Sequence, residues 1–478
     1  MRWTITQVAG AVGARTGAGL DPVARVAGVS IDSRTVRAGE LFLAIHGPRH
    51  DGHDHVAGAL ERGALAAMVS ESQLGRYTET VRHRCIAVAD TFVALKGLAR
   101  AVRDGWGGKI AGVTGSVGKT TTKEILAALL GTRFRVLKSE GNFNNEYGLP
   151  LTLFRLDETH QAAVLEMGMS RSGELSRLAE IARPDVGVVT RVAPAHLEFF
   201  ASVEEIALAK RELIEGLNGR ESAAVLNADD PLVAAFAPHA PGRVLTYGIT
   251  HAADFRAEAI EDRGAIGSTF VLVRGGKRVR LELALAGRHV ISNALAALAA
   301  ASVWGIGAAQ AQEVLQNLRA PAMRGELLRF TNGAALINDS YNSSPAALHA
   351  MISVLAATPD YHRRILAAGE MRELGQTSPQ LHREAGSFAA KTGKIDWVIG
   401  VAGDGSQIVE GAVSAGLSRA QTKFFASSEE AAKFLSDFVV PGDLLLVKGS
   451  RGVKMERVVE ELVARHAAGT PLGEKVPH

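Results

Sequence analysis

The sequence predicts an α/β protein with three domains. A chain of 478 residues is too long for a single hydrophobic core. Short apolar segments typical of buried strands alternate with helical segments, as they do in parallel α/β sheets. One such strand, at 110–113, breaks into glycines directly before a helix. We expect a small α/β domain at residues 1–105, a central domain with a parallel sheet at 106–318, and a Rossmann-like α/β domain at 319–478.

The composition excludes several classes of protein. The net charge is only +3, and the sequence has neither a basic tail nor a basic run with interleaved aromatic residues, so nucleic-acid binding is not indicated. Cys85 is the only cysteine, which excludes an internal disulfide and a cysteine-based zinc site. The N-terminus lacks a signal-peptide core, and no run of about 18 apolar residues occurs. We therefore expect a cytoplasmic protein without membrane insertion.

The first 105 residues predict a small α/β unit. We expect its helices and strands at 6–14, 29–32, 41–45, 54–62 and 65–69. Asp32, Ser33 and Arg34 follow a strand, where they either bind an anionic or nucleotide ligand or form a plain turn, and their spacing favours neither reading. Four histidines between His46 and His55 lie in a Gly/Pro loop without the regular spacing of a metal site, and we expect no metal there.

Residues 109–126 predict the phosphate-binding loop of a P-loop ATPase-type domain. Glycines let backbone N–H groups approach phosphate oxygens, Lys119 supplies a positive charge and Thr120 a Mg²⁺ ligand at the start of a helix. Five residues separate Gly112 from Gly118, one more than in the common P-loop pattern. A nucleoside triphosphate is the expected ligand. The residues expected to hold it are Gly115, Ser116, Gly118, Lys119, Thr120 and Thr121.

Polar residues also follow other strands of the central domain. An apolar strand ends in Glu166, and a second one, at 186–190, leads to His196. Ligands in open α/β sheets lie beyond the carboxyl ends of strands, so both side chains are expected beside the phosphate loop. The loop at 142–145 is unusually rich in asparagine and contains Asn144 and Asn145, although such loops are usually only turns.

Lys210 falls on the apolar face of a predicted helix. Ser202 and Glu205 form a capping box, and Ile206, Lys210 and Leu213 follow at helical spacing on one face. Either this lysine reaches the rim of the protein, or it is a buried amine with a lowered pKa. A neutral amine reacts with CO₂ to give a carbamate, which is an anionic metal ligand.

The rest of the chain predicts a second parallel sheet. Asn293 begins an alanine-rich helix, where it either caps the helix or contacts a base edge. In the last part, strands are expected at 334–338, 364–368, 397–401 and 443–447, each followed by a helical segment. Polar segments follow these strands at 339–345, 369–375 and 448–456.

Taken together, these motifs resemble those of the Mur ligase family, the ATP-dependent amide-bond ligases of peptidoglycan precursor synthesis. The resemblance covers essentially the whole chain, and the five-residue gap in the phosphate loop is a feature of this family. The motifs that carry it include Asp32-Ser-Arg-Thr, Thr114-Gly-Ser-Val-Gly-Lys-Thr-Thr-Thr-Lys-Glu, Asn142-Phe-Asn-Asn, Glu166-Met-Gly, Ala195-His-Leu-Glu, Lys210-Arg-Glu, Asn227-Ala-Asp-Asp-Pro, Gly287-Arg-His-Val-Ile-Ser-Asn and Lys448-Gly-Ser-Arg-Gly.

Within the family, the run Asp339-Ser-Tyr-Asn-Ser-Ser-Pro is similar to that of members that add D-alanyl-D-alanine to UDP-N-acetylmuramoyl-tripeptide (UDP-MurNAc-tripeptide). The Asp-Asn-Pro-Arg motif of the diaminopimelate-adding members is absent. Ser343 and Ser344 replace the Ala-Asn that relatives often have, which is a minor departure. The resemblance implies ligation through an acyl phosphate.

The resemblance also implies a role for each candidate residue. Lys119, Glu166, His196 and Lys210 are the expected catalytic residues. Thr120 and Glu166 are expected to hold one Mg²⁺, and His196 with a carbamylated Lys210 (N6-carboxylysine) a second. ATP is expected to contact Asn293 at adenine, Arg324 at the γ-phosphate and Asp339 at ribose.

The substrate residues follow in the same way. Ser33 and Arg34 are expected to receive UDP, Asn144 and Asn145 the muramoyl part, and Tyr341 and Asn342 the dipeptide. A hinge at 319–325 is expected to close the third domain over ATP, and we expect a monomer. Two alternatives are a folylpolyglutamate-type ligase of the same fold, which lacks a UDP-binding domain, and a non-catalytic nucleotide-binding scaffold, which needs no intact Lys119, Glu166, His196 and Lys210.

Overall fold

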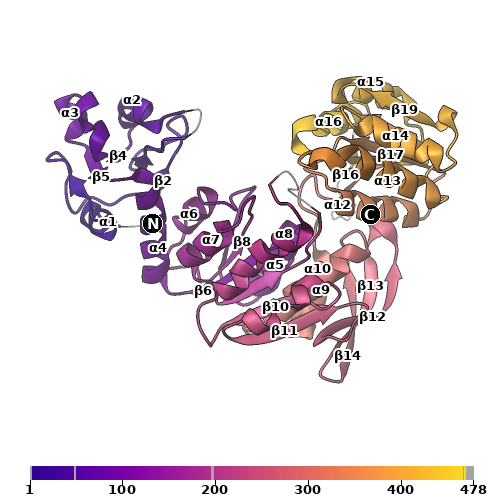
Figure 1. Cartoon of the computed structure of the whole chain (residues 1–478), viewed down its shortest axis with the longest axis horizontal. Helices are drawn as coiled ribbons and strands as arrows, with labels where there is room; N and C mark the ends of the chain where they lie inside the picture. The colour runs from indigo at the N-terminus through magenta and orange to yellow at the C-terminus, as the bar shows by residue number, and fades with distance from the viewer. Residues whose placement is uncertain (1–2, 48–49, 195–198, 467, 470–478) are drawn as a thin grey trace, which may run out of the picture.

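The computed structural model describes residues 3–47, 50–194 and 199–466 and the backbone of 468–469. Three sheets follow one another along the long axis of the molecule (Figure 1). The first contains residues near the N-terminus, the second the middle of the chain, and the third the C-terminal part. The predicted α/β fold class is confirmed.

The first sheet has five strands in the order β1-β5-β4-β3-β2. Its strands pair in parallel except β1, which runs antiparallel to β5. All four residues of β5 are buried, as expected for a sheet covered on both faces. The elements are α1 (Ile5–Val12), β1 (Arg15–Thr16), β2 (Val29–Ser30), β3 (Leu41–Leu43), α2 (Val56–Glu61), β4 (Ala66–Ser70), α3 (Glu79–Arg82), β5 (Cys85–Val88) and α4 (Thr91–Trp106).

The central sheet has nine strands in the order β14-β13-β12-β11-β10-β9-β6-β8-β7. Strands β6 to β12 pair in parallel, whereas β13 and β14 add an antiparallel extension. The predicted parallel sheet is thus present, and its antiparallel extension was not predicted. A tight turn at Gly275 and Gly276, whose φ angles of +52° and +75° suit a two-residue hairpin, joins β13 to β14. The strands are β6 (Lys109–Thr114), β7 (Val136–Lys138), β8 (Ala162–Glu166), β9 (Val186–Val189), β10 (Ala223–Asn227), β11 (Arg243–Gly248), β12 (Phe255–Asp262), β13 (Ser268–Arg274) and β14 (Lys277–Leu283).

Helices cover both faces of the central sheet. α5 and α10 contribute to one apolar core, and α6, α7 and α8 to the other. That second core continues into the first domain, because Leu95 and Leu98 of α4 belong to the same cluster as Leu178 of α7. The helices are α5 (Lys119–Gly131), α6 (Gly148–Leu153), α7 (Glu174–Ala182), α8 (Val203–Glu215), α9 (Pro231–Ala234), α10 (Arg288–Ser302) and α11 (Ala308–Asn317).

The third sheet has seven strands in the order β19-β18-β17-β20-β16-β15-β21. The four predicted strands and β19 pair in parallel, whereas β19 itself and the antiparallel edge of β15 and β21 were not predicted. The strands are β15 (Glu326–Phe330), β16 (Ala335–Asp339), β17 (Arg363–Gly369), β18 (Trp397–Val401), β19 (Thr422–Phe425), β20 (Asp443–Lys448) and β21 (Ala468–Gly469). The helices are α12 (Pro345–Ala357), α13 (Ser378–Lys391), α14 (Gly405–Ser414), α15 (Ser428–Phe438) and α16 (Glu456–His466).

The third domain contacts the central domain beside α12. The backbone N–H of Ala265, in the turn between β12 and β13, donates to the hydroxyl of Thr358 at 2.9 Å. Gly264 in the same turn lies so close to Thr358 that a Cβ would be 2.3 Å from its hydroxyl oxygen. In the described part of the chain, no helix is both long and apolar enough to cross a membrane.

Candidate active site

A cavity of about 1240 Å³ lies between the central and third domains. Its central-domain wall includes the phosphate loop and Glu166 at the carboxyl end of β8. Its third-domain wall includes Arg324, Asp339 and Tyr341. Ligands of open α/β sheets lie at this end of the strands, so the cavity is the candidate active site.

The phosphate loop is built so closely that only glycine fits at two positions. A Cβ on Gly115 would lie 1.9 Å from the hydroxyl oxygen of Thr190, and one on Gly118 would lie 2.4 Å from Oδ1 of Asn293. Both glycines also have a positive φ angle, which residues with a Cβ atom rarely adopt. Asn293 of α10 therefore packs directly onto the loop.

Lys119 begins α5 and lies against the loop that precedes it. Its Nζ donates to the carbonyl oxygen of Gly115 at 2.7 Å. Burial lowers the pKa of Lys119, although the carboxylate of Glu166 acts in the opposite direction. The ammonium group is thus held at the mouth of the loop, where phosphates bind in proteins of this local structure.

Glu166 is held at both of its carboxylate oxygens. The hydroxyl of Thr120 donates to Oε2 at 2.7 Å, and the amide Nδ2 of Asn144 donates to Oε1 at 2.9 Å. The side chain is almost completely buried, with 4% of the residue exposed. Two hard oxygen donors, Thr120 and Glu166, thus touch beside the phosphate loop, and this donor set fits Mg²⁺ shared with nucleotide phosphates. No group of three or more His, Cys, Asp or Glu side chains suited to a metal occurs among the described residues.

Two residues that support Glu166, Ser139 and Lys123, were not predicted as site residues from the sequence. The hydroxyl of Ser139 accepts a hydrogen bond from the backbone N–H of Glu166 at 3.1 Å. The buried Lys123 of α5 donates to the carbonyl oxygen of the same serine at 2.7 Å. Lys123 lies one helical turn after Thr120, so helical spacing from the expected metal ligand was the available clue.

Lys210 of α8 is buried, as its helical spacing predicted, with 3% of the residue exposed. It lines the cavity instead of reaching the outer surface. Burial lowers the pKa of Lys210 well below its ordinary value, and the positive charge of Lys119 lowers it further. The hydroxyl of Ser202 accepts from the backbone N–H of Glu205 at 3.2 Å and caps the helix as expected, but the carboxylate of Glu205 accepts from the backbone N–H of Ala201, so the second half of the predicted capping box does not form. His196, predicted to share a metal with Lys210, lies outside the described residues.

On the opposite wall, a buried ion pair holds the expected ribose contact. Lys448 at the end of β20 donates to Oδ2 of Asp339 at 2.6 Å and to the carbonyl oxygen of Asn342 at 2.8 Å. The guanidinium of Arg324 lies 4.1 Å from the ring centroid of Tyr341. The role of Lys448 was not predicted, although its motif was recognised.

The cavity brings together most of the predicted site residues. Those that line it are Ser116, Gly118, Lys119, Thr120, Thr121, Asn144, Asn145, Glu166, Lys210, Asn293, Arg324, Asp339, Tyr341 and Asn342. In addition to lining it, Asn145 supports the chain locally, because its Oδ1 accepts from the backbone N–H groups of Tyr147 and Gly148.

Ser33 and Arg34 do not line this cavity and lie in the first domain, after β2. Arg34 donates through Nε and Nη2 to the two carboxylate oxygens of Asp32, at 2.9 and 2.7 Å. These hydrogen bonds lower the pKa of Asp32 to about 2. The exposed guanidinium is therefore already oriented on the domain surface, apart from the phosphate loop.

Comparison with known proteins places the whole chain in one family. The Mur ligase family catalytic domain matches residues 25–103, the Mur ligase middle domain 113–301, and the Mur ligase glutamate ligase domain 323–451. The chain belongs to the Mur ligase family. All three sheets of this Mur ligase contain residues from these matches.

The most informative relatives of this Mur ligase share one name, UDP-N-acetylmuramoyl-tripeptide–D-alanyl-D-alanine ligase. The Bacillus subtilis protein is 35% identical over 91% of this chain and 93% of its own length, and the Escherichia coli K12 protein is 34% identical over the same shares. Among solved structures, MurF from Acinetobacter baumannii has a TM-score of 0.87 and 28% identity over 97% of this chain and 99% of its own. The MurF ligase from Thermotoga maritima, solved in complex with ADP, has a TM-score of 0.79 and 30% identity over 92% and 98%.

Proposed function

We propose that this Mur ligase joins D-alanyl-D-alanine to UDP-MurNAc-tripeptide, in an ATP-dependent reaction of peptidoglycan precursor synthesis. Curated relatives that span most of the chain carry this activity in their names. The observation that carries the proposal is the single cavity that contains both the phosphate loop and Arg324, Asp339 and Tyr341 of the third domain. ATP and an incoming amine supplied from opposite walls meet in such a cavity.

In this proposal each domain has its own task. Residues 1–105 bind UDP through Ser33 and Arg34, and residues 106–318 bind ATP. Residues 319–478 close over ATP and bind the dipeptide through Tyr341 and Asn342. Asn293 contacts adenine, and Asp339 contacts the ribose. The ion pair with Lys448 orients the carboxylate of Asp339.

The first chemical step transfers the γ-phosphoryl group of ATP. The terminal carboxylate of the tripeptide attacks the γ-phosphorus, ADP leaves, and an acyl phosphate forms. Lys119 and Arg324 neutralise the charge on the transferred group, which is the main requirement for phosphoryl transfer. Mg²⁺ held by Thr120 and Glu166 would supply further neutralisation of the phosphates.

The second step forms the amide bond. The amine of D-alanyl-D-alanine attacks the acyl carbon, a tetrahedral intermediate forms, and inorganic phosphate leaves with the oxygen that came from the carboxylate. The amine loses its proton in the process. Lys210 as a carbamate, together with His196, would supply a second Mg²⁺ site, since a carbamate provides the anionic oxygens that this cation prefers.

We propose further that the protein acts as a cytoplasmic monomer and does not bind nucleic acid. Its small net charge of +3 and the lack of a basic run in the sequence support the last point. UDP-MurNAc-tripeptide, ATP and the dipeptide are then its substrates, with Mg²⁺ as the expected cation.

Phosphate release measured against a matrix of substrates tests the function. We expect release only when UDP-MurNAc-tripeptide, D-alanyl-D-alanine and ATP are all present. Replacing the dipeptide by diaminopimelate or glutamate, or the UDP-tripeptide by a folate, should reduce release to background. Equal release with free glutamate and a folate acceptor would instead identify a folylpolyglutamate-type ligase.

A further inference from the structure

Helix α4 connects the first domain to the phosphate loop. It begins after β5 of the first sheet and ends three residues before β6, the strand that leads into the loop. At about 1.5 Å per residue its 16 residues span about 24 Å. On the first-domain side it packs against α1 and β4, and on the central side against α6 and α7. This helix therefore carries the first domain on the central one.

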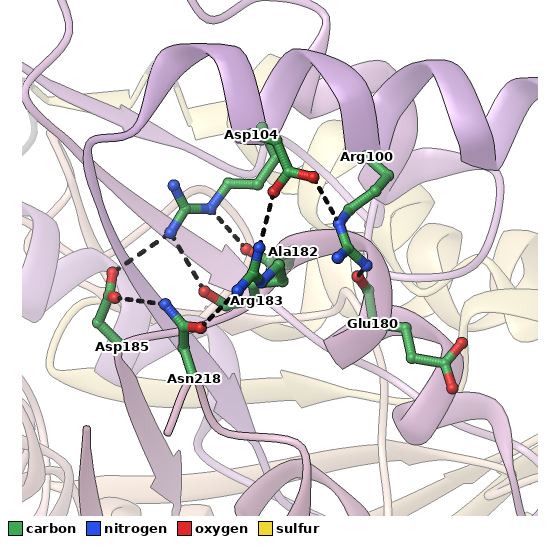
Figure 2. Close-up of polar contacts among 8 residues, drawn as sticks. Arg100, Asp104, Glu180, Ala182, Arg183, Asp185 and Asn218 are labelled. Carbon is green, nitrogen blue, oxygen red and sulfur yellow. Dashed lines mark hydrogen bonds and ion pairs between the residues drawn. The ribbon is translucent and has the colours of Figure 1, made fainter. Parts of the chain in front are cut away.

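A cluster of charged side chains fastens the C-terminal half of α4 to the central domain (Figure 2). We call it the Arg103 cluster, and it consists of Arg100, Arg103, Asp104, Arg183, Asp185 and Asn218. Arg100 donates to the carbonyl oxygen of Glu180 at 2.6 Å, and Arg183 donates to Asp104 at 3.2 Å. In Figure 2 the side chains of Asp104, Arg183, Asp185 and Asn218 converge, whereas Glu180 and Ala182 at the end of α7 take part through their backbone carbonyl oxygens.

Arg103 is the buried member of the cluster, with 6% of the residue exposed. Its Nε donates to the carbonyl oxygen of Ala182 at 2.8 Å, and its Nη2 donates to that of Arg183 at 3.2 Å. The same Nη2 lies 3.5 Å from Oδ2 of Asp185. The two carbonyls belong to the C-terminal end of α7, where the helix dipole is negative, so a forked cation suits this position.

The acceptors of Arg103 are themselves fixed to the central sheet. Oδ2 of Asp185 also accepts from the backbone N–H of Ile110 in β6 at 2.8 Å. At the other end of α7, the backbone N–H groups of Gly173 and Ser176 donate to Glu212 of α8 at 2.7 and 3.0 Å. Glu212 lies two residues after Lys210 in the same helix. Arg103 thus joins α4 to the same elements that hold the phosphate loop and Lys210.

The N-terminal half of α4 is attached mainly by contacts that are less directional. The ring of Phe92 lies 4.8 Å from that of Tyr147, and the partly buried Lys96 lies 3.6 Å from Glu146. Leu95 and Leu98 pack into the apolar core shared with α7. Apolar packing holds the helix against the central domain but is non-directional, whereas the buried guanidinium of Arg103 has three oriented acceptors. The directional contacts that set the rotation of α4 are therefore concentrated at its C-terminal end.

We propose that Arg103 is a positioning residue that sets the rotation of α4, and with it the placement of the UDP-binding domain relative to the phosphate loop. The proposal rests on the proposed function, in which one substrate molecule spans both domains. A ligand that binds at two sites binds tightly only when the two sites are separated by the length of the ligand. That separation sets the effective concentration of the second end of the ligand at its site once the first end is bound. Arg103 would fix the separation of the UDP site and the phosphate loop without touching the substrate.

Binding of fragments separates positioning from damage to either site. We would measure dissociation constants for UDP-MurNAc-tripeptide, UDP and ATP with Arg103→Met and Arg103→Lys. The spanning substrate should bind roughly tenfold more weakly to Arg103→Met, since its two ends no longer fit together. UDP, which occupies only the first domain, and ATP, which lies between the central and third domains, should both stay within about twofold of wild type, because neither spans α4. Arg103→Lys, which keeps the charge but not the fork, should give an intermediate loss.

Arg419→Met is the matched control. Like Arg103, Arg419 donates more than one hydrogen bond, but both go to the carboxylate of Glu410 and the side chain lies exposed on the third domain. This variant should bind all three ligands as the wild type does. Equal weakening of UDP and the spanning substrate by Arg103→Met, or no weakening of either, would overturn the proposal.

A distance measurement tests the same inference without any substrate. Spin labels at Arg62→Cys in the first domain and Arg133→Cys in the central domain report their separation. Burial raises the pKa of the native Cys85 thiol to about 11 and leaves 1% of that residue exposed, so labelling is selective for the introduced cysteines. The distance distribution should be narrow in wild type and broad with Arg103→Met. An unchanged width contradicts the proposal, whereas failure of the wild type to bind UDP-MurNAc-tripeptide contradicts only the proposed function.

Discussion

At the residue scale, Glu166 shows how a single carboxylate is prepared for a cation. Thr120 and Asn144 each occupy one of its oxygens, and Ser139 holds its backbone. Residues that orient a metal ligand in this way affect metal affinity almost as strongly as the ligand does. Asn144, which family resemblance assigned to the muramoyl substrate, is thus equally well placed to act through Glu166.

We expect Asn144→Ala to raise the Mg²⁺ concentration required for half-maximal activity by roughly ten- to a hundredfold. The Michaelis constant for UDP-MurNAc-tripeptide at saturating Mg²⁺ should change far less. Steady-state kinetics as a function of Mg²⁺ checks this. A large rise in that Michaelis constant with an unchanged Mg²⁺ requirement would instead support a direct substrate contact.

Lys210 provides the second prediction at this scale. Burial lowers the pKa of the Lys210 amine well below its ordinary value, which favours the neutral form, and only the neutral form reacts with CO₂. Lys210→Ala should lose roughly a hundredfold or more of kcat, because a charge that stabilises the transition state is removed. Short carboxylic acids should restore part of it. Full activity of this variant in buffer depleted of CO₂ and carboxylic acids would show that no carbamate is needed.

At the scale of elements, the phosphate loop depends on its contact with α10. Gly118→Ala would place a methyl group against Asn293 and force a non-glycine residue into φ +85°. Strain of this kind costs about 1–3 kcal/mol, so ATP should bind roughly tenfold more weakly or worse. Gly131→Ala in the same helix α5 is the control, since nothing lies within 4 Å of its added Cβ. Equal ATP affinity of both variants, measured by calorimetry, would rule out this close packing.

Asp229 fastens the loop after β11, and its effect on stability depends on pH. Burial alone would raise its pKa, but hydrogen bonds from the side chain of Thr250 and from the backbone N–H groups of residues 249–251 lower it to about 2. A carboxylate with a depressed folded pKa stabilises the protein above its unfolded pKa of about 4, and this stabilisation is lost as the pH falls toward 2.

Asp229→Asn should therefore lower the free energy of unfolding by about 2 kcal/mol at neutral pH. Between about pH 4 and pH 2 the difference from wild type should shrink, because the wild type loses the same contribution there. Thermal unfolding across this pH range measures both effects. A difference that stays constant down to pH 2 would contradict the assignment.

The sequence predicts elements well where the signal is local. The cap residue Ser202 predicted the start of α8 correctly, and the spacing of Ile206, Lys210 and Leu213 predicted the burial of Lys210. Contacts between distant segments had no such signal. Asn144 and Glu166 are 22 residues apart, and Arg103 and Ala182 are 79 apart, so their hydrogen bonds depend on tertiary packing. The antiparallel strands β15 and β21 are short edge strands, for which local patterns are weakest.

At the scale of the whole molecule, the first and central domains are joined more closely than the sequence indicated. They share one apolar core through α4, and the Arg103 cluster fastens that helix at its end. The third domain has one core of its own, and its other core takes in only Ala265 and Ala286 from the central domain, which it otherwise faces across the cavity. The expected closure at 319–325 therefore requires the third domain to move against a unit formed by the other two.

The chemistry proposed for this cavity is tested most directly by tracing the two oxygen atoms of the tripeptide's terminal carboxylate into the products. UDP-MurNAc-tripeptide labelled with ¹⁸O in its terminal carboxylate is incubated with ATP and D-alanyl-D-alanine, and both products are analysed by mass spectrometry. An acyl phosphate intermediate predicts a UDP-MurNAc-pentapeptide with one label and inorganic phosphate that carries the other. Unlabelled phosphate, or phosphate release without the pentapeptide, would contradict the account.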